Sequence, residues 1–254
     1  MFNGKYITDK HIQSRVGKHF IYPYPIFFMK FKAIVADIDG TITCEKRELH
    51  LGAMKKIRSL KIPVVLATGN TLCYARTASR LIGLNGAVIA ENGGAITSRF
   101  DLQGTFEESL EECEKAYSVL SNYFKLTKLD PLYRKTEIAL RRDFNLEKAR
   151  YLLKTLDLDI EMVDTKYAIH LKSTKINKGV GLQKLAGMMD LKSKNFVAIG
   201  DSENDLEMFE VSGFGIAVGN GDEIIKEAAD YVTEASYGDG AVEALEFLES
   251  KGWI

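Results

Sequence analysis

Two patterns of apolar and polar residues, one typical of buried strands and one of helices, alternate along the chain. From Phe31 the run FKAIVADI is almost continuously apolar and rich in β-branched residues, as in a strand buried on both faces of a parallel sheet. LGAMKKIRSLK and TLCYARTASRLIGL have apolar residues at helical spacing, whereas IPVVLATGN and GAVIAENGG are two more buried strands. This alternation predicts right-handed crossovers and an α/β fold with a doubly wound parallel sheet.

The pattern changes after about Ile96 and returns at Lys175. Between them we predict a long helix with an acidic start in TFEESLEECEKAYSVLSNYF, a second helix in NLEKARYLLKTL, and short strands in TEIALRRDF, DIEMV and YAIHLKS. After Lys175 we predict helices in KGVGLQKLAGMM and ENDLEMFEV, strands in NFVAIGD and FGIAVGN, and two further helical stretches. The middle part is therefore expected to be a smaller α+β insertion in the doubly wound core.

Residues 1–28 precede the first predicted strand. Their aromatic run IYPYPIFF is too short to cross a bilayer, since a crossing helix needs about 20 residues, and no small-residue cleavage site follows it. Met29 begins MKFKAIVADIDG, a natural start for the first strand. We expect residues 1–28 to be either an extension outside the fold or a terminal arm packed on its surface.

Composition excludes several kinds of partner. Of the 254 residues, 46% are hydrophobic and 27% are charged, and the formal net charge is -1. Because no long run of lysine and arginine occurs, neither nucleic acid nor a membrane is an expected partner. The three cysteines, Cys44, Cys73 and Cys113, suit neither a disulfide framework nor a CxxC metal site. We expect reduced thiols in a cytoplasmic protein.

Polar residues follow three of the predicted core strands. Asp37 and Asp39 end the first, residues 68–70 (TGN) the second, and Asp201 the strand in NFVAIGD. Ligands of open α/β sheets bind at this edge. A plain turn remains an alternative for the motif DIDG, since Asp and Gly favour turns. A calcium loop is excluded because Ile42 stands where such a loop needs glycine.

A second acidic motif, GDSENDLEMF, places Asp201 and Asp205 four residues apart across a helix start, where N-capping explains one of them. If both share a pocket with Asp37 and Asp39, the repulsion is severe, because two unit charges about 4 Å apart interact with about 4 kcal/mol at an effective dielectric near 20. Oxygen ligands with room for water favour Mg²⁺, which proteins often share with a phosphate. The aspartates therefore predict a Mg²⁺ site.

In the same order as here, DIDGT, ATGN, the lysine of NKGVGLQKL and GDSENDLEMF resemble the four motifs of the haloacid dehalogenase (HAD) superfamily of phosphohydrolases. The resemblance covers Phe31 to roughly Glu249. It implies a Rossmann-like core, residues 29–95 and 172–254, with a mobile α/β cap of the C2 type, residues 96–171. The chain is most similar to archaeal phosphoglycolate phosphatases, whose second motif ends in Gly-Asn, whereas sugar-phosphate phosphatases tend to have Gly-Arg.

The resemblance implies a role for each motif residue. Asp37 is expected to attack phosphorus and form an aspartyl-phosphate. Asp39 is expected to protonate the leaving group as general acid and then to activate water as general base. The Thr68 hydroxyl is expected to bind a phosphoryl oxygen, with Gly69 and Asn70 beside it at the substrate.

A lysine is expected to neutralise the phosphoryl oxygens. Lys178 is the preferred candidate because it stands with a glycine just before an apolar helix, and Lys175, one turn away, is its rival. The resemblance also implies the Mg²⁺ ligands, which are the Asp37 carboxylate, the Asp39 backbone carbonyl and Asp201, with Asp205 binding directly or supporting the others. Gly40 and Thr41 are expected to shape the turn that carries this group.

The expected function is hydrolysis of a small phosphorylated metabolite, 2-phosphoglycolate, with Mg²⁺. Four basic residues of the insertion are candidates for binding the substrate carboxylate, because a guanidinium binds a carboxylate with two hydrogen bonds: Arg134, Lys135, Arg141 and Arg142. A sugar-phosphate phosphatase, a phosphomutase using the same aspartyl-phosphate, and a non-catalytic binding domain remain alternatives. His170, in a predicted cap strand, is interpreted as structural. The sequence does not indicate the oligomeric state.

Overall fold

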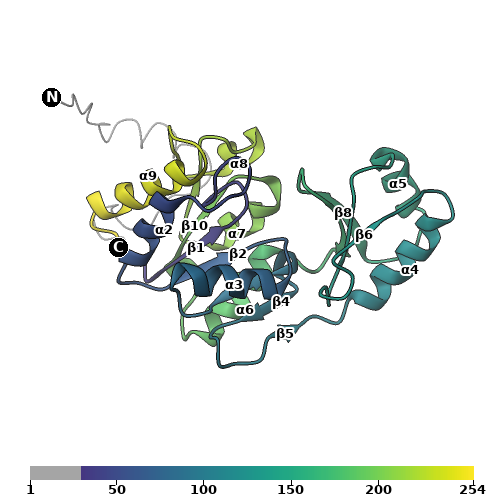
Figure 1. The fold of residues 1–254 in the computed structure, drawn as a ribbon, viewed down its shortest axis with the longest axis horizontal. Coiled ribbons are helices and arrows are strands. Elements are labelled where there is room, and N and C mark those ends of the chain that lie inside the picture. Colours follow the sequence, from purple (N-terminus) through teal and green to yellow (C-terminus); the bar gives the residue numbers. More distant parts are fainter. Residues whose placement is uncertain (1–29) are drawn as a thin grey trace.

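The computed structural model describes residues 30–254, and the predicted extension, residues 1–28, lies outside the described residues. Two units lie side by side (Figure 1). The core is built on an eight-stranded sheet, the core sheet, and the cap on a four-stranded sheet, the cap sheet. Among the described residues, no helix is long and apolar enough to cross a membrane.

The core sheet is parallel except at one edge. In spatial order its strands are β12 (Tyr231–Val232), β11 (Phe214–Ala217), β10 (Phe196–Gly200), β1 (Ala33–Asp37), β2 (Val64–Ala67), β3 (Val88–Ala90), β4 (Ala95–Thr97) and β5 (Thr105–Phe106). The strands from β12 to β3 are parallel, and β4 and β5 extend the sheet antiparallel. This order confirms the predicted doubly wound α/β class, because the chain leaves β1 toward β2 and later returns on its other side at β10.

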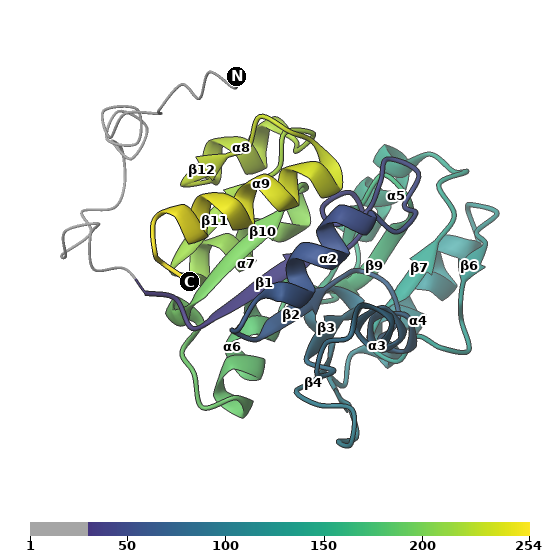
Figure 2. The ribbon, with the colours of Figure 1, turned by 60° about the vertical axis from the view of Figure 1, so that its left-hand side comes forward.

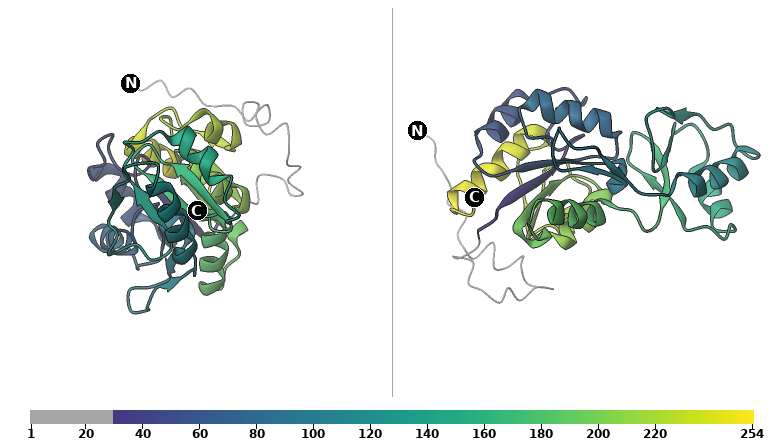
Figure 3. Two further views of the ribbon diagram at one scale, coloured as in Figure 1. Left: turned by 90° about the vertical axis from the view of Figure 1, so that its right-hand side faces the viewer. Right: turned by 90° about the horizontal axis from the view of Figure 1, so that it is seen from below.

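Helices cover both faces of the core sheet (Figure 3). One face packs against α2 (Leu51–Ser59), α3 (Leu72–Ile82) and α9 (Tyr237–Ser250), and the other against α6 (Lys178–Met188), α7 (Leu206–Val211) and α8 (Glu223–Ala228). Ile34 and Ala36 join the first hydrophobic layer, whereas Ala33 and Val35 join the second. Successive strand residues point to opposite faces, which explains why this strand is apolar throughout.

The cap sheet is covered by helices on one face only (Figure 2). Its antiparallel strands, in spatial order, are β6 (Lys128–Leu129), β7 (Ile138–Leu140), β9 (Ile169–Ser173) and β8 (Ile160–Asp164), and its helices are α4 (Leu110–Ser121) and α5 (Leu146–Leu153). Ile138, Ile169 and Leu171 pack against those helices in a separate hydrophobic cluster. The alternate residue His170 therefore points to the opposite face, which is turned toward the core.

Two predictions about the insertion were wrong in detail. The helix predicted from Thr105 begins at Leu110, and Thr105–Phe106 is instead strand β5 of the core sheet. The predicted insertion, residues 96–171, therefore includes residues of β4 and β5 that pair with the core. These strands, like β6 and β12, are two or three residues long, so they show no readable periodicity. Short 3₁₀ turns, η2 (Glu91–Gly93), η3 (Ser193–Asn195) and η4 (Glu203–Asp205), complete the fold.

Candidate active site

Three neighbouring core strands bring the sequence motifs together. Strand β1 lies between β10 and β2, and all three run in the same direction. Asp37, Thr68 and Asp201 stand at or just after their carboxyl ends. This is the position where the order of strands reverses, and such switch points open a crevice in doubly wound sheets.

The turn after β1 requires the glycine of the motif. Gly40 has φ +95°, and a Cβ atom at this position would lie 2.7 Å from Asp201 Oδ2, so any other residue would be strained and would collide with that carboxylate. The Gly40 backbone N–H donates to Thr43 Oγ1 at 3.0 Å. The Thr41 hydroxyl donates to Asp201 Oδ1 at 2.8 Å. This turn therefore fixes the end of β1 against the acidic motif after β10.

Lys178 is fully buried and lies between two aspartates. It is the first residue of α6, whose N-cap Asn177 accepts the Val180 N–H at 2.8 Å. Its Nζ lies 2.5 Å from Asp37 Oδ1 and 2.7 Å from Asp205 Oδ1. Burial alone would lower its pKa, but the charges of Asp205 and Asp37 raise it above the ordinary value, so the ammonium form persists.

The rival lysine, Lys175, does not reach the site. Its side chain is exposed and pairs with Asp159. The structure thus brings Lys178, and not Lys175, to the end of β1, as the sequence analysis preferred.

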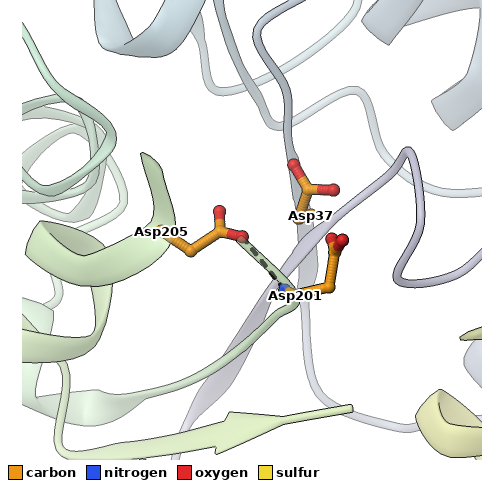
Figure 4. Close-up of side chains that lie close together, drawn as sticks. All are labelled: Asp37, Asp201 and Asp205. Atoms are coloured by element: carbon orange, nitrogen blue, oxygen red, sulfur yellow. Dashed lines mark hydrogen bonds between the residues drawn. The ribbon is translucent and has the colours of Figure 1, made fainter. Parts of the chain in front are cut away.

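Asp37, Asp201 and Asp205 form a buried acidic cluster (Figure 4). One oxygen atom from each lies within 4.8 Å of the others. Burial, with added repulsion from neighbouring carboxylates, holds the pKa of Asp37 well above its usual range, although Lys178 opposes this. Burial and the charge of Asp205 raise the pKa of Asp201 to about 7. The single ammonium of Lys178 therefore does not balance the cluster.

This excess of negative charge fits a divalent cation, because a bound metal ion lowers the pKa of its ligands and would keep these carboxylates ionised. Asp205 Oδ1 binds Lys178, and its Oδ2 accepts the N–H groups of Asp201 and Ser202 at 3.1 and 3.2 Å. Both of its oxygens are thus engaged within the protein. The donor set leaves the Asp37 and Asp201 carboxylates better placed to bind the ion, with Asp205 supporting them.

Asp39 lies beside this cluster and is held by different partners. Arg47 Nε and the Tyr74 hydroxyl donate to Asp39 Oδ1 at 2.8 and 3.1 Å. The Thr68 hydroxyl donates to Asp39 Oδ2 at 3.5 Å. Asp39 is not a member of the acidic cluster among the described residues. The two aspartates of DIDG are therefore separated into different environments, as distinct chemical roles require.

A cavity of about 140 Å³ lies between the core and the cap over these residues. The sequence-predicted residues that line it are Asp37, Asp39, Thr68, Gly69, Asn70 and Asp201. Lys178 and Asp205 are buried next to it. The cap contributes Arg134, Lys166, Tyr167 and His170. Of the four basic candidates in LYRKTEIALRR, Arg134 alone lines the cavity, while Lys135, Arg141 and Arg142 are exposed on the cap.

Several residues at the cavity had no assigned role in the sequence analysis. The Arg47 guanidinium, which pairs with Asp39, lies 4.3 Å from the ring centre of Tyr167 in the cap. His170, interpreted as structural, lines the cavity and lies 2.7 Å from Glu137. Among the residues that support the cavity wall, a usable signal existed only for Asn92, which does not line the cavity but donates to Glu137 Oε2 at 2.9 Å. The signal is that the polar residues of AENGG follow a third core strand. The loop positions of Arg47 and Tyr167 carry no such periodicity.

Comparisons with known proteins agree with this geometry. A family model described as haloacid dehalogenase-like hydrolase matches residues 34–144 and 144–245. A phosphoglycolate phosphatase of Methanosarcina acetivorans is 81% identical over 226 residues, which are 89% of this chain and 100% of that protein. A phosphoglycolate phosphatase of Archaeoglobus fulgidus is 45% identical over 86% of this chain and 97% of that protein.

Solved structures share the fold at lower identity. A Thermoplasma acidophilum protein superposes with a TM-score of 0.79 at 23% identity, covering 89% of this chain and 100% of that one. The sucrose-phosphatase of Synechocystis superposes with a TM-score of 0.66 at 18% identity, covering 87% and 99%. At these identities the likeness concerns the fold alone.

Proposed function

The chain belongs to the haloacid dehalogenase-like hydrolases and is a phosphatase of phosphoric monoesters, and from this premise we propose that it hydrolyses 2-phosphoglycolate through Asp37 with Mg²⁺ as cofactor. The family membership confirms the resemblance seen in the motifs. The proposed role of Asp37 rests mainly on one observation. Lys178 Nζ lies 2.5 Å from Asp37 Oδ1 in a buried contact at the floor of the cavity.

In the first step, a carboxylate oxygen of Asp37 attacks phosphorus and the bond from phosphorus to the ester oxygen breaks. Asp39 donates its proton to that oxygen, so glycolate leaves as the alcohol and an aspartyl-phosphate remains. The contact of Lys178 with Asp37 supports this assignment, because an ammonium there stabilises the charge of the transferring phosphoryl group.

In the second step, Asp39 takes a proton from water, whose oxygen attacks phosphorus and releases phosphate from Asp37. Asp39 lines the cavity outside the acidic cluster, where Arg47, Tyr74 and Thr68 hold it in place for proton transfer. The proton that it takes from water in the second step is the one that it donates to the ester oxygen in the next turnover. The Thr68 hydroxyl, which now meets Asp39 Oδ2, is also within the cavity to donate to a phosphoryl oxygen.

Asp37, Asp201 and the Asp39 backbone carbonyl would hold Mg²⁺, with Asp205 supporting them. When bound, the ion supplies positive charge that draws the phosphoryl oxygens to Asp37 and offsets the negative charge of the cluster. The raised pKa values of Asp37 and Asp201 support this assignment, because both carboxylates are poorly compensated by the protein alone.

The substrate assignment rests on two observations. Relatives that align along nearly their whole length are named phosphoglycolate phosphatases. The cavity is also small, about 140 Å³, a volume comparable to one that accommodates benzene. A two-carbon ester fits within this volume.

Phosphate release from 2-phosphoglycolate, glucose 6-phosphate and p-nitrophenyl phosphate, each with Mg²⁺, tests the proposal. We expect the highest kcat/KM for 2-phosphoglycolate. A higher kcat/KM for glucose 6-phosphate would replace the substrate assignment by a sugar-phosphate phosphatase. Conversion of glucose 1-phosphate to glucose 6-phosphate without phosphate release would indicate a phosphomutase instead.

A further inference from the structure

Arg134, a residue of the cavity wall, has one buried guanidinium N–H group without a hydrogen-bond partner within residues 30–254. Its side chain is 6% exposed and lines the cavity opposite the core motifs. Nη1 donates to the Gly69 carbonyl at 2.9 Å and to Glu137 Oε1. Nε is buried and has no hydrogen-bond partner among the described residues. Buried polar groups in native proteins are nearly always paired, so an orphaned guanidinium N–H needs an explanation.

The Nη1 group of Arg134 is held in place from both units. Glu137 is 1% exposed and also lies 2.7 Å from His170 Nδ1. Asn92 of the core donates to Glu137 Oε2 at 2.9 Å and accepts from Asn204 at 3.1 Å. These contacts fix Nη1 between cap and core. The Nε edge is therefore preorganised and does not have to be ordered by a ligand.

The other cations at the cavity each have a carboxylate partner. Arg47 Nε binds Asp39 at 2.8 Å, and Lys166 pairs with Asp222 at 2.5 Å. Lys178 lies between Asp37 and Asp205. Arg134 also has a carboxylate partner, Glu137, but it differs from them in having a buried N–H group, Nε, that meets no acceptor in the part of the chain that the structure describes.

We propose that Arg134 determines specificity by binding the carboxylate of the substrate through its Nε and Nη2 edge, an inference that rests on the proposed phosphatase function. This edge matches a carboxylate with two parallel N–H···O bonds. The phosphoryl group then lies toward Asp37 on the core wall of the same cavity. Glu137 is the positioning residue, because it holds Nη1 and leaves the other edge free.

Two esters that differ in the carboxylate test the proposal: 2-phosphoglycolate and ethyl phosphate. In the wild type we expect kcat/KM to favour 2-phosphoglycolate by roughly 100-fold, since losing one partner of a desolvated charge pair usually costs a factor of this order or more. Arg134→Lys keeps a positive charge beside Glu137 but loses the two parallel N–H donors of the guanidinium. In this variant the ratio should fall at least about 10-fold, mainly because KM for 2-phosphoglycolate rises. Arg142→Ala, which removes an exposed cap arginine paired with Asp164, is the matched control and should keep the wild-type ratio.

Inhibitor binding to the wild type provides a test that needs no variant to fold. Phosphonoacetate should inhibit ethyl phosphate hydrolysis much more strongly than ethylphosphonate, which lacks the carboxylate. Equal inhibition by the two, or an unchanged ester ratio in folded Arg134→Lys, would overturn the role of Arg134 while leaving the phosphatase proposal intact. Failure of the wild type to hydrolyse either ester would overturn the proposed function itself.

Discussion

The carboxyl edge of the core sheet and the open face of the cap sheet build opposite walls of one cavity by different means. At the core edge, functional residues are neighbours in sequence, as in DIDGT and TGN, because each motif is a strand end with its turn. On the cap face they alternate with core-forming residues, as His170 does between Ile169 and Leu171. Strands buried on both faces leave only their ends for chemistry, whereas a sheet covered on one side offers its other face.

This difference indicates that the core edge and the cap face have separate roles, phosphoryl transfer and substrate selection. The core edge holds the acidic cluster, Lys178 and the aspartates of DIDG, which would act on any phosphoryl group. The cap face holds Arg134 with its network of Glu137 and His170, which would meet the remainder of the substrate. Changes at the core edge should therefore affect all esters equally, and changes on the cap face should affect their ratio or the stability of the cap.

The largest effect is expected for Asp37→Asn at the core edge. Loss of the nucleophile should lower kcat on 2-phosphoglycolate and p-nitrophenyl phosphate alike by at least about 10³-fold. The melting temperature should not fall, because a neutral amide relieves repulsion within the acidic cluster. Steady-state kinetics and thermal unfolding of the purified variant check both points. Retention of more than a few per cent of the wild-type rate would mean that Asp37 is not the nucleophile.

Removal of divalent cations should come next in size. EDTA is expected to abolish hydrolysis of every ester, and excess Mg²⁺ to restore it. Mg²⁺ should also raise the melting temperature of the wild type by several degrees, since a ligand at 100 times its Kd stabilises by about 2.7 kcal/mol. Asp201→Asn should lose this thermal shift, and Asp190→Asn, at an exposed aspartate outside the cavity, should keep it. A full shift in Asp201→Asn would place the cation elsewhere.

Much of the core edge, but little of the cap face, was predictable from the sequence. Asp37, Thr68 and Asp201 could be placed because a buried strand followed by a polar turn ends at the ligand-binding edge of such a sheet. The alternation around His170 showed which side of the strand packs inward, but periodicity does not tell what the other side meets. That information depends on how the cap is set against the core, for which no local pattern exists.

Glu137→Gln on the cap face should lower the free energy of unfolding by about 2 kcal/mol at neutral pH. Because Glu137 holds Arg134 Nη1, the same change should also lower the preference for 2-phosphoglycolate over ethyl phosphate without lowering kcat on ethyl phosphate. Burial alone would raise the pKa of Glu137, but His170, Arg134 and Asn92 outweigh burial and hold it below the ordinary value of 4.5. A lowered pKa in the folded state stabilises the protein above pH 4.5, and this contribution is lost as the pH falls through the folded-state pKa.

Denaturant unfolding of the wild type and Glu137→Gln between pH 7 and about pH 3 measures this difference. The gap between their free energies of unfolding should be widest near pH 7 and should narrow below pH 4.5. Glu147→Gln, at an exposed glutamate of α5, is the control and should show no comparable gap. A gap that widens toward low pH would contradict the assigned ion pairs.

The smallest effect concerns the thiols of the two units. Cys113 is fully buried in the cap cluster, and burial raises the pKa of its thiol to about 12. Cys73 of the core is exposed and Cys44 is half-buried. With Ellman's reagent at pH 8, we expect Cys44 and Cys73 to react in the native protein and Cys113 only after unfolding. Equal reactivity of Cys113 in the folded state would show that the cap cluster is not packed as described.

The central claim, that the core edge transfers the phosphoryl group through Asp37, is tested most directly by acid quenching of the wild type during its first turnover of 2-phosphoglycolate. Peptide mapping by mass spectrometry then locates the bound phosphoryl group. The account predicts a transient phosphoryl group on Asp37, formed before free phosphate and absent from Asp37→Asn. A phosphoryl group on another residue, or release of phosphate with none on Asp37 throughout that turnover, would contradict it.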